Sequence, residues 1–296
     1  MKYANINIDM DTLYEDLNIH VSAAERDKLI KLSYDKVLPN VLDFFENKKI
    51  KTTFVVIGRD AKLVPKHIKK ISDQGHEIAN HSFNHIRNFT GLKPKEIHSE
   101  ISKCNEAIHK ITGVKCNGFR APCYNVNSDV LKIISKNNLT YDMSIVNSFL
   151  YQMLKKSYKM TMKNKEYVTD TQRMSVPKRP YKEHGIVAFP ISNSKIFSLP
   201  FITGLHLNMG KRLSKTITKD YMNNPFLNIN AHLMEFMDVR DFQKINMKNF
   251  VVAPKLVKMD YRKEYFYKLV DRLKKKNFKI LRMDDIISSP DLIKTF

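Results

Sequence analysis

Short apolar runs alternate along the chain with longer segments whose apolar residues recur every three or four positions. The clearest strand-like runs alternate in polarity or are rich in β-branched residues: "YANINID" (3–9), "KTTFVVIG" (51–58) and "FLNINAH" (226–232). The clearest helical segments are 22–47, 94–112 and 262–276. Strands that alternate with helices pair through βαβ units, so the pattern predicts an α/β fold with a parallel sheet.

In the helical segment 22–47, Ser22 is the expected N-cap and Pro39 is a point where the helix can be interrupted. Six or seven βαβ units in 296 residues fit a barrel, closed or incomplete, better than a small open sheet. The stretch 150–185 breaks this rhythm, because it is rich in Lys and Met and has weak periodicity. We interpret it as an insertion or lid within a single domain that spans residues 1–296.

Reactive side chains follow the predicted strands at the points where the strands end. The first strand ends in "NIDMD", which contains Asp9 and Asp11. Residues i and i+2 of an extended chain face the same side, so both carboxylates can point into one site. The alternative is that both are turn or helix-capping aspartates.

The third strand ends at Asn80 and is followed by "HSFNH", which contains His81 and His85. If a helix begins here, the two imidazoles lie one turn apart on one face and can bind one ion. The spacing also arises by chance, with both histidines facing solvent. One Asp with two His, and open positions for water, would suit Zn²⁺ or a similar divalent metal.

Two further strands end in candidate functional residues. The run "GFRAPCY" places Arg120 and Tyr124 at its end, where an arginine can hold a nearby carboxylate ionised and oriented. His232 ends "FLNINAH" and is either a core histidine bonded to a carbonyl or a general acid. The alternative for Arg120 is an ordinary surface arginine at a strand end.

Composition adds limits on partners and compartment. The chain has 51 Lys and Arg against 30 Asp and Glu, a formal net charge of +21, which attracts polyanions. The excess is spread along the chain without a recognised nucleic-acid motif, so nucleic acid is not an expected partner. The three cysteines form no CxxC pair, and no apolar run approaches the roughly 18 residues of a membrane helix. The start "MKYANINIDMD" lacks the order of a secretory leader, so we expect a cytoplasmic protein that can associate with membranes.

With these residues assembled, the sequence resembles the polysaccharide deacetylases, the NodB-homology group of carbohydrate esterase family four. The resemblance is closest over 51–124, from "TTFVVIGRDAKLVPKHIKKISDQGHEIANHSFNH" to "GFRAPCY", and "YDMS" (141–144) resembles the strand that follows. More weakly it extends from residue 5 to about residue 288. The segments "PYKEHGIVAFPIS", "LPF" and "NAHLMEF" are similar to members that act on surface-glycan or lipid-linked sugars.

The resemblance implies a distorted (β/α)7 barrel and metal-dependent hydrolysis of an amide. It places the metal ligands at Asp11, His81 and His85. It places the catalytic base at Asp9, with Arg120 as the arginine that orients that base. Zn²⁺ is the metal expected first, with Co²⁺, Ni²⁺, Fe²⁺ and Mn²⁺ as alternatives.

The resemblance further implies that the backbone N–H of Tyr124 helps to hold the oxyanion and that His232 protonates the leaving amine. His206, in "GLHLNMG", is a rival for this acid, and we prefer His232 because it ends a clear strand. The family's Asp-Trp motif, which tunes this histidine, is not recognisable in a chain without Trp. Asp142 and Glu235 are weak candidates for the missing carboxylate.

The first motif also departs from the family pattern, because Met10 separates Asp9 and Asp11 where the family has adjacent aspartates. The same spacing occurs in the branch that deformylates lipid-linked sugars, and the roles of the two aspartates can be exchanged.

From the resemblance we expect an N-deacetylase that acts on an amino sugar in a glycan or a lipid-linked glycan precursor. The substrate can be anionic, and the basic surface, together with 150–185, can contact an anionic membrane. A deformylase or a hydrolase of cyclic ureides or imides is the nearer alternative. A catalytically silent glycan-binding protein is the more distant one, although every expected ligand and base position is filled.

Overall fold

Strand β1 (Lys2–Asp9) lies at the centre of a parallel sheet and pairs along its length with β8 (Phe226–His232). On its other side it pairs with β2 (Thr53–Val56). The computed structural model describes residues 1–17, 21–153, 176–195, 198–238 and 259–289. The strands predicted at 3–9 and 226–232 are therefore neighbours in space.

The sheet continues from β2 through four more parallel strands. In spatial order these are β3 (Glu77–Asn80), β4 (Gly118–Phe119), β5 (Tyr141–Asp142) and β7 (Ile186–Ala188). Two short strands are added to this path: β6 (Tyr181–Glu183), antiparallel to β7, and β9 (Phe278–Ile280), parallel to the start of β1. Seven of the described strands thus follow one another in parallel, in the order β7-β5-β4-β3-β2-β1-β8.

The first and last strands of this order, β7 and β8, are connected by the segment that follows β7, which forms hydrogen bonds with β8. The N–H group of Ser192 donates to the carbonyl of Asn228 on β8 at 3.1 Å, and the N–H of Asn230 donates to the carbonyl of Phe201 at 3.0 Å. The sheet is therefore curled into a barrel with one irregular junction. This confirms the predicted α/β fold and the distorted (β/α)7 barrel.

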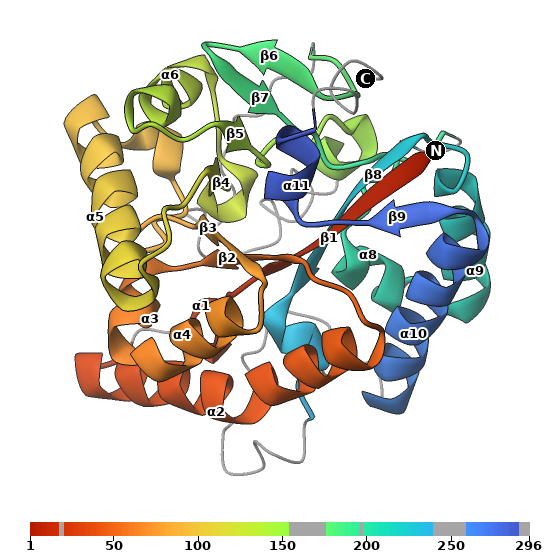
Figure 1. Ribbon diagram of the computed structural model, residues 1–296, viewed down its shortest axis with the longest axis horizontal. Helices are drawn as coiled ribbons and strands as arrows, with labels where there is room; N and C mark the ends of the chain where they lie inside the picture. The colour runs from red at the N-terminus through yellow and green to blue at the C-terminus, as the bar shows by residue number, and fades with distance from the viewer. Residues whose placement is uncertain (18–20, 154–175, 196–197, 239–258, 290–296) are drawn as a thin grey trace.

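Helices surround the strands (Figure 1). The described α-helices are α1 (Leu13–Leu17), α2 (Ala23–Asn47), α3 (Gly58–Leu63), α4 (Pro65–Asp73), α5 (Pro94–Thr112), α6 (Ser128–Lys136), α8 (Thr203–Asn208), α9 (Lys211–Tyr221), α10 (Met259–Lys275) and α11 (Met283–Ile287). The 3₁₀ turns are η1 (Phe89–Gly91), η2 (Pro122–Tyr124) and η4 (Leu233–Phe236).

Helix α2 begins as predicted, because Ser22 accepts a hydrogen bond from the N–H of Glu25, whose carboxylate in turn accepts from the N–H of Ser22. The helix is continuous, however, and Pro39 does not interrupt it. Pro39 lies on the exposed face, where water can satisfy the carbonyl group that the missing proline N–H leaves free.

Side chains of β1 alternate between the barrel interior and the helical layer. Ile6 and Ile8 belong to the main hydrophobic core between sheet and helices. Asn5, Asn7 and Asp9 are also buried, but they face the interior of the barrel and make polar contacts there. The period of two therefore leads the polar row of β1 to Asp9 at the carboxyl end of the strand.

The opposite, amino-terminal end of the barrel is covered by α11. Met283 and Ile286 pack in a hydrophobic cluster with residues of β2, β3, β5 and β7. The N–H groups of Met283 and Asp284 donate to side chains at the starts of β2 and β3. The amino-terminal end of the barrel is therefore covered, whereas the candidate site residues follow the carboxyl ends of the strands.

The predicted insertion 150–185 falls mostly outside the described residues, since the structure does not describe 154–175. Its last part forms β6, at the edge of the sheet. That 1–296 is a single domain stays a prediction. Within the described ranges, none of the helices combines the length and the apolar character that crossing a membrane requires.

Candidate active site

Asp11, His81 and His85 converge just beyond the carboxyl ends of β1 and β3. Oδ1 of Asp11 lies 3.3 Å from Nε2 of His81 and 3.3 Å from Nε2 of His85. One ligand atom from each residue lies within 4.8 Å of the other two. Both histidines are buried and Asp11 is half-buried, so the cluster lies at the edge of the protein interior and not on an exposed surface.

His81 and His85 do not lie on a helix, so the condition under which they would be one helical turn apart is not met. Residues 81–88 form a loop in which Ser82 and His85 have φ angles of 61° and 57°, outside the α-helical range. Glu100 of α5 accepts hydrogen bonds from two consecutive N–H groups of this loop, at 3.0 and 2.7 Å. The Ser82 hydroxyl accepts from the N–H of His85 at 3.0 Å. Side-chain acceptors thus replace helical carbonyls and still bring the two rings together.

The ring of His81 is oriented by the strand beside it. Its Nδ1 lies 2.8 Å from the carbonyl oxygen of Arg120, which can only accept, so Nδ1 carries the proton. In the neutral ring the lone pair of Nε2 therefore faces Asp11, as in metal-bound histidines that are fixed by a second hydrogen bond. Burial alone would raise the pKa of the Asp11 carboxyl. In the protonated form of the two rings, the charge of His85 and the hydrogen bonds from both histidines outweigh the effect of burial and hold the pKa of Asp11 well below its usual range.

The donor set fits a divalent metal. Oδ1 of Asp11 and Nε2 of His85 are buried, and neither makes a hydrogen bond of acceptable geometry with any described residue. Buried polar atoms without partners cost free energy, and a cation held between them would remove that cost. Two imidazoles and one carboxylate are ligands that suit Zn²⁺ and related ions.

Asp9 lies next to this cluster but has different partners. Its Oδ1 accepts a hydrogen bond from Nη1 of Arg120 at 2.5 Å, and its Oδ2 lies 3.8 Å from Nε2 of His232. Arg120 is fully buried, and its Nη1 also donates to Oδ1 of Asn7 at 2.6 Å. The structure therefore separates the two aspartates: Asp11 faces the histidine pair, whereas Asp9 faces the arginine.

A row of buried asparagines supports Arg120, and sequence reasoning missed it. The tripeptide Asn-Ile-Asn occurs at 5–7 in β1 and again at 228–230 in β8, and the two copies are in register. Nδ2 of Asn7 donates to Oδ1 of Asn228 at 2.7 Å, and Nδ2 of Asn230 donates to Oδ1 of Asn7 at 3.3 Å. The repeated alternation was the available signal for a polar barrel interior.

His232 is paired with Glu235, which lies three residues further along in η4. Nδ1 of His232 lies 3.2 Å from Oε1 of Glu235. Burial alone would lower the pKa of His232, but the hydrogen bond to Glu235 and the charge of Asp9 raise it to about 10. His232 is therefore protonated at neutral pH, with Nε2 directed toward Asp9.

Glu235 is itself held in place from α8. The hydroxyl of Thr203 donates to Oε2 of Glu235 at 2.5 Å, and Glu235 is buried. The next residue, Gly204, lets the chain pass close to the carboxylate, since a Cβ there would lie 3.1 Å from Oε1. A 3₁₀ turn and a neighbouring helix thus fix the carboxylate that accompanies His232.

The other candidates for these roles are engaged elsewhere. Asp142 accepts hydrogen bonds from the N–H and hydroxyl of Ser144, and within the described ranges it forms neither a hydrogen bond nor an ion pair with His232. His206 is fully buried, its Nε2 lies 3.2 Å from the hydroxyl of Tyr221, and burial lowers its pKa to about 4. The structure therefore places His206 in the core, as a neutral side chain.

Tyr124 lies beside the site in η2, with a φ angle of 58°. Its hydroxyl donates to Oδ1 of Asn230 at 2.5 Å. Its backbone N–H donates to the carbonyl of Ala121 at 3.0 Å, so the group expected to hold an oxyanion already has a partner. A substrate oxygen would have to share or replace that bond.

Known proteins share both sequence and fold with this chain. Residues 23–141 match the family model described as polysaccharide deacetylase, a range that includes His81, His85 and Arg120. The peptidoglycan-N-acetylmuramic acid deacetylase PdaA of Bacillus subtilis (strain 168) is 34% identical over 129 residues, which cover 42% of this chain and 49% of that protein. The chain thus spans about half the length of this curated relative.

Two solved structures show the same fold at 15% identity. One, from Mycobacterium smegmatis and described as a polysaccharide deacetylase, superposes with a TM-score of 0.62 over 96% of this chain and 89% of its own. The other, from Bacillus anthracis, superposes with a TM-score of 0.53 over 96% of this chain and 64% of its own. The second is a pseudoenzyme of carbohydrate esterase family four, so the fold alone does not imply catalysis.

Proposed function

Because the chain belongs, by residues 23–141, to the polysaccharide deacetylase family, we propose that it is a hydrolase that removes the N-acetyl group of an amino sugar. One observation carries the proposal: the cluster of Asp11, His81 and His85 lies beside an Asp9–Arg120 pair and a protonated histidine. A pseudoenzyme would be expected to lack one of these groups, whereas here each position is occupied.

In this proposal Asp11, His81 and His85 hold a divalent metal, Zn²⁺ first among the candidates. When bound, the ion supplies a Lewis acid that polarises the amide carbonyl and activates water for attack. The ligands are prepared for this task because Asp11 is ionised and the ring of His81 is fixed by the Arg120 carbonyl. Co²⁺, Ni²⁺, Fe²⁺ and Mn²⁺ suit similar donor sets.

Asp9 is the proposed general base. Arg120 donates a charge-assisted hydrogen bond to one oxygen of Asp9 and keeps the carboxylate oriented. The second oxygen, Oδ2, is directed to the side of His232 and is available to accept the proton of the attacking water. This division of labour assigns Asp9 to proton transfer and Asp11 to the metal.

His232 is the proposed acid for the leaving amine, because an amine leaves poorly unless it is protonated. Glu235 keeps Nδ1 of the ring occupied and the imidazolium form stable, so the proton on Nε2 faces the site. The proposed oxyanion contact of Tyr124 requires that its N–H be shared between Ala121 and the substrate oxygen.

The glycan is proposed to be a surface polysaccharide or a lipid-linked precursor, with peripheral contact to an anionic membrane. The net charge of +21 supports an anionic partner. Co-sedimentation with phosphatidylglycerol vesicles at low salt tests the membrane contact, and protein that stays in the supernatant would remove that part of the proposal.

The test of the reaction combines metal analysis of the purified protein with a screen of acetylated and formylated amino sugars. Acetate and formate are measured separately. Acetate release that is lost when the metal is removed supports deacetylation. Release of formate alone would favour a deformylase, the alternative that the Asp9-Met10-Asp11 spacing brings in. Release of neither by metal-loaded protein would favour a glycan-binding pseudoenzyme.

A further inference from the structure

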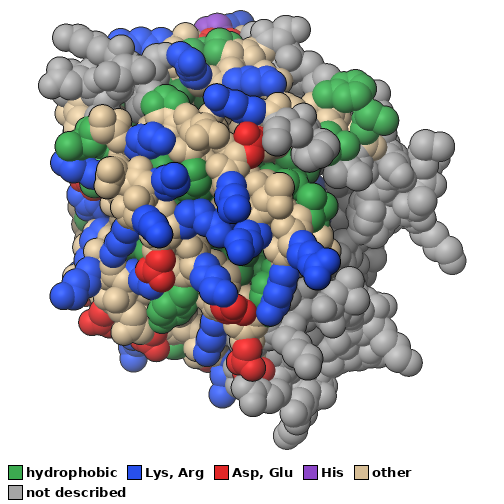
Figure 2. All heavy atoms as spheres, turned by 90° about the vertical axis from the view of Figure 1, so that its right-hand side faces the viewer, with side chains coloured by type: hydrophobic (Ala, Val, Ile, Leu, Met, Phe, Trp, Pro, Cys, Tyr) green, Lys and Arg blue, Asp and Glu red, His purple; other side chains and the backbone are tan. Residues whose placement is uncertain are grey.

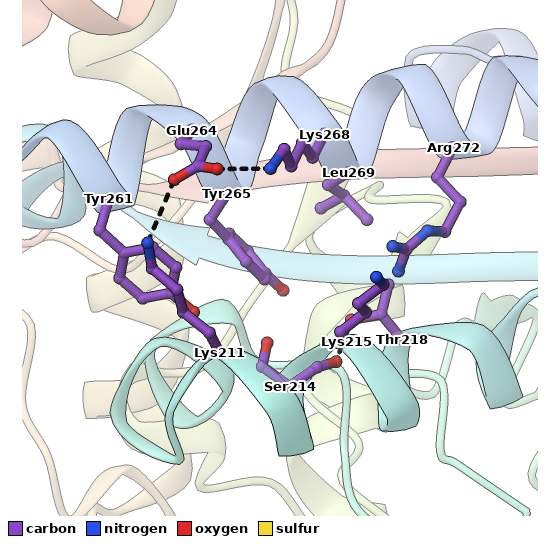
Figure 3. A pocket seen from close by; sticks show the side chains of 10 residues that line it. All are labelled: Lys211, Ser214, Lys215, Thr218, Tyr261, Glu264, Tyr265, Lys268, Leu269 and Arg272. Atoms are coloured by element: carbon purple, nitrogen blue, oxygen red, sulfur yellow. Dashed lines mark hydrogen bonds and ion pairs between the residues drawn. The ribbon is translucent and has the colours of Figure 1, made fainter.

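Helices α9 and α10 enclose a groove on the outside of the barrel, with a volume of about 380 Å³ (Figure 3). Both helices contribute side chains to it, namely Lys211, Ser214, Lys215, Thr218, Tyr261, Glu264, Tyr265, Lys268, Leu269 and Arg272. None of these residues belongs to the candidate active site. A cavity of this size can enclose a small polar group.

The floor of the groove contains the buried hydroxyl of Tyr265. Tyr265 is only 8% exposed, and its ring extends from α10 toward α9 (Figure 3). Its hydroxyl has a close side-chain neighbour, Thr218, and the two do not form a hydrogen bond of good geometry. The hydroxyl of Thr218 gives its own proton to the carbonyl of Ser214 at 2.6 Å, so it can only accept from Tyr265. A charged phosphate oxygen is a stronger acceptor than the Thr218 hydroxyl, so a phosphate in the groove would give Tyr265 a better hydrogen bond.

The rim of the groove is cationic. Glu264 pairs with Lys268 and, at 3.5 Å, with Lys211, which accounts for one negative charge among four positive ones. Lys215 and Arg272 form no ion pair with a carboxylate of the described chain, and they point toward each other from the two helices (Figure 3). Figure 2 shows Lys and Arg side chains gathered on this face of the molecule. Two facing cations repel each other unless an anion lies between them.

We propose that this groove binds a phosphate group of a ligand. Lys215 and Arg272 supply the charge, the guanidinium of Arg272 offers a fork of donors that matches phosphate oxygens, and Tyr265 adds a neutral donor from the floor. Binding here is independent of the proposed deacetylation, because the groove shares no residue with Asp11, Asp9 or their partners.

The experiment is isothermal titration calorimetry of the purified full chain with sodium pyrophosphate, at low salt. Three proteins are compared with the wild type: Lys215→Ala/Arg272→Ala, Tyr265→Phe, and Lys115→Ala/Lys136→Ala. The last variant is the matched control, since Lys115 and Lys136 are exposed and lie outside the groove. Circular dichroism melting of each variant shows that it is folded before titration.

The double groove variant should bind pyrophosphate about tenfold more weakly or worse, because two charge-assisted contacts are lost. Tyr265→Phe should weaken binding by a smaller factor, about fivefold, as expected for one neutral hydrogen bond. The control should bind as the wild type does. Equal affinity of all four proteins, or an equal loss in the control, would overturn the proposal. If pyrophosphate binds at the Asp11 cluster instead, all four proteins should bind it with equal affinity, which also overturns the proposal.

A second arm identifies the source of the phosphate group. Wild-type protein and Lys215→Ala/Arg272→Ala are sedimented with phosphatidylglycerol vesicles and with neutral phosphatidylcholine vesicles. If the wild type sediments with the anionic vesicles and the groove variant does not, the result supports the groove and assigns the phosphate to a lipid head group. If the variant loses pyrophosphate binding but both proteins bind the vesicles equally, the result supports the groove and assigns the phosphate to a soluble ligand.

Discussion

Nδ1 of His232 lies 3.2 Å from Oε1 of Glu235, and the carboxylate is fixed from the other side by Thr203. This pairing raises the pKa of His232 to about 10, against an ordinary value of 6.5. Replacing Glu235 by Gln removes the charge while nearly preserving the shape of the side chain. The pKa of His232 should then fall toward its ordinary value, and the alkaline limb of the kcat profile for acetate release should move to lower pH.

The same pairing makes stability depend on pH in a defined direction. Between about pH 6.5 and 10 the folded protein keeps the proton on His232 and the unfolded chain does not, so the free energy of unfolding falls as pH rises. In Glu235→Gln this fall should be smaller. Urea unfolding of both proteins at pH 6, 8 and 10 measures it, and parallel curves would contradict the assignment of Glu235.

Loss of either histidine of the cluster should remove metal and activity together. His81→Ala or His85→Ala leaves two protein ligands where three are proposed, and catalysis without the ion should fall by several orders of magnitude. Metal content by atomic emission and acetate release are measured on the same preparation. A variant that keeps stoichiometric metal would exclude its histidine as a ligand. His206→Asn is the control, and it should retain bound metal.

Asp9→Asn should keep the metal and lose turnover. The amide cannot accept the proton of the attacking water, and general-base catalysis contributes about 10²–10⁴ in rate. Asp11→Asn, compared directly, should lose metal as well. The opposite pattern, with metal lost from Asp9→Asn and retained by Asp11→Asn, would show that the two aspartates have exchanged roles.

Tyr124→Phe should lower stability more than activity. The change leaves Oδ1 of Asn230 buried without the hydroxyl that donates to it, which costs about 1–3 kcal/mol. The backbone N–H of residue 124 is unchanged, so kcat should stay within about threefold of the wild type if only that N–H contacts the substrate. A large loss of kcat at unchanged stability would instead assign the phenol itself to the reaction.

Gly118→Ala tests how tightly β4 packs against β5. A Cβ at this position would lie 2.0 Å from Cζ of Tyr141, a fully buried ring in the barrel interior. We expect the free energy of unfolding to fall by about 1–3 kcal/mol or more. The loss should be partly recovered in Gly118→Ala/Tyr141→Val, because the smaller side chain removes the contact, and thermal melts of the variants compare them. Additive losses would contradict this explanation.

Much of the site could be predicted from where strands end. Asp9 and Asp11 are two residues apart at the end of a buried strand, and the histidines follow another, so parallel pairing alone brings them to one edge of the sheet. The local conformation of 81–88 could not be predicted, because the loop depends on Glu100, which arrives from a helix further along the chain.

The partner of His232 was equally hard to choose from sequence. Asp142 and Glu235 are both acidic residues near strand ends. The 3₁₀ turn after β8 is what brings the carboxylate of Glu235 back to the ring of His232. The support from Thr203 comes from a helix that the periodicity did not reveal. The barrel's polar interior was readable in principle, since Asn-Ile-Asn occurs in two predicted strands.

The left-handed backbone at His85 restricts which amino acids natural variation can place there. Besides Gly, the residues most enriched in this region are Asn, Asp and His, and a β-branched side chain is strongly disfavoured. Of these residues only Asp and His are both tolerant of the geometry and good ligands for a divalent ion. A relative that has changed this position while keeping its metal should therefore carry Asp, and an Asn or Gly here would mark a chain that has given up the ion while keeping the loop.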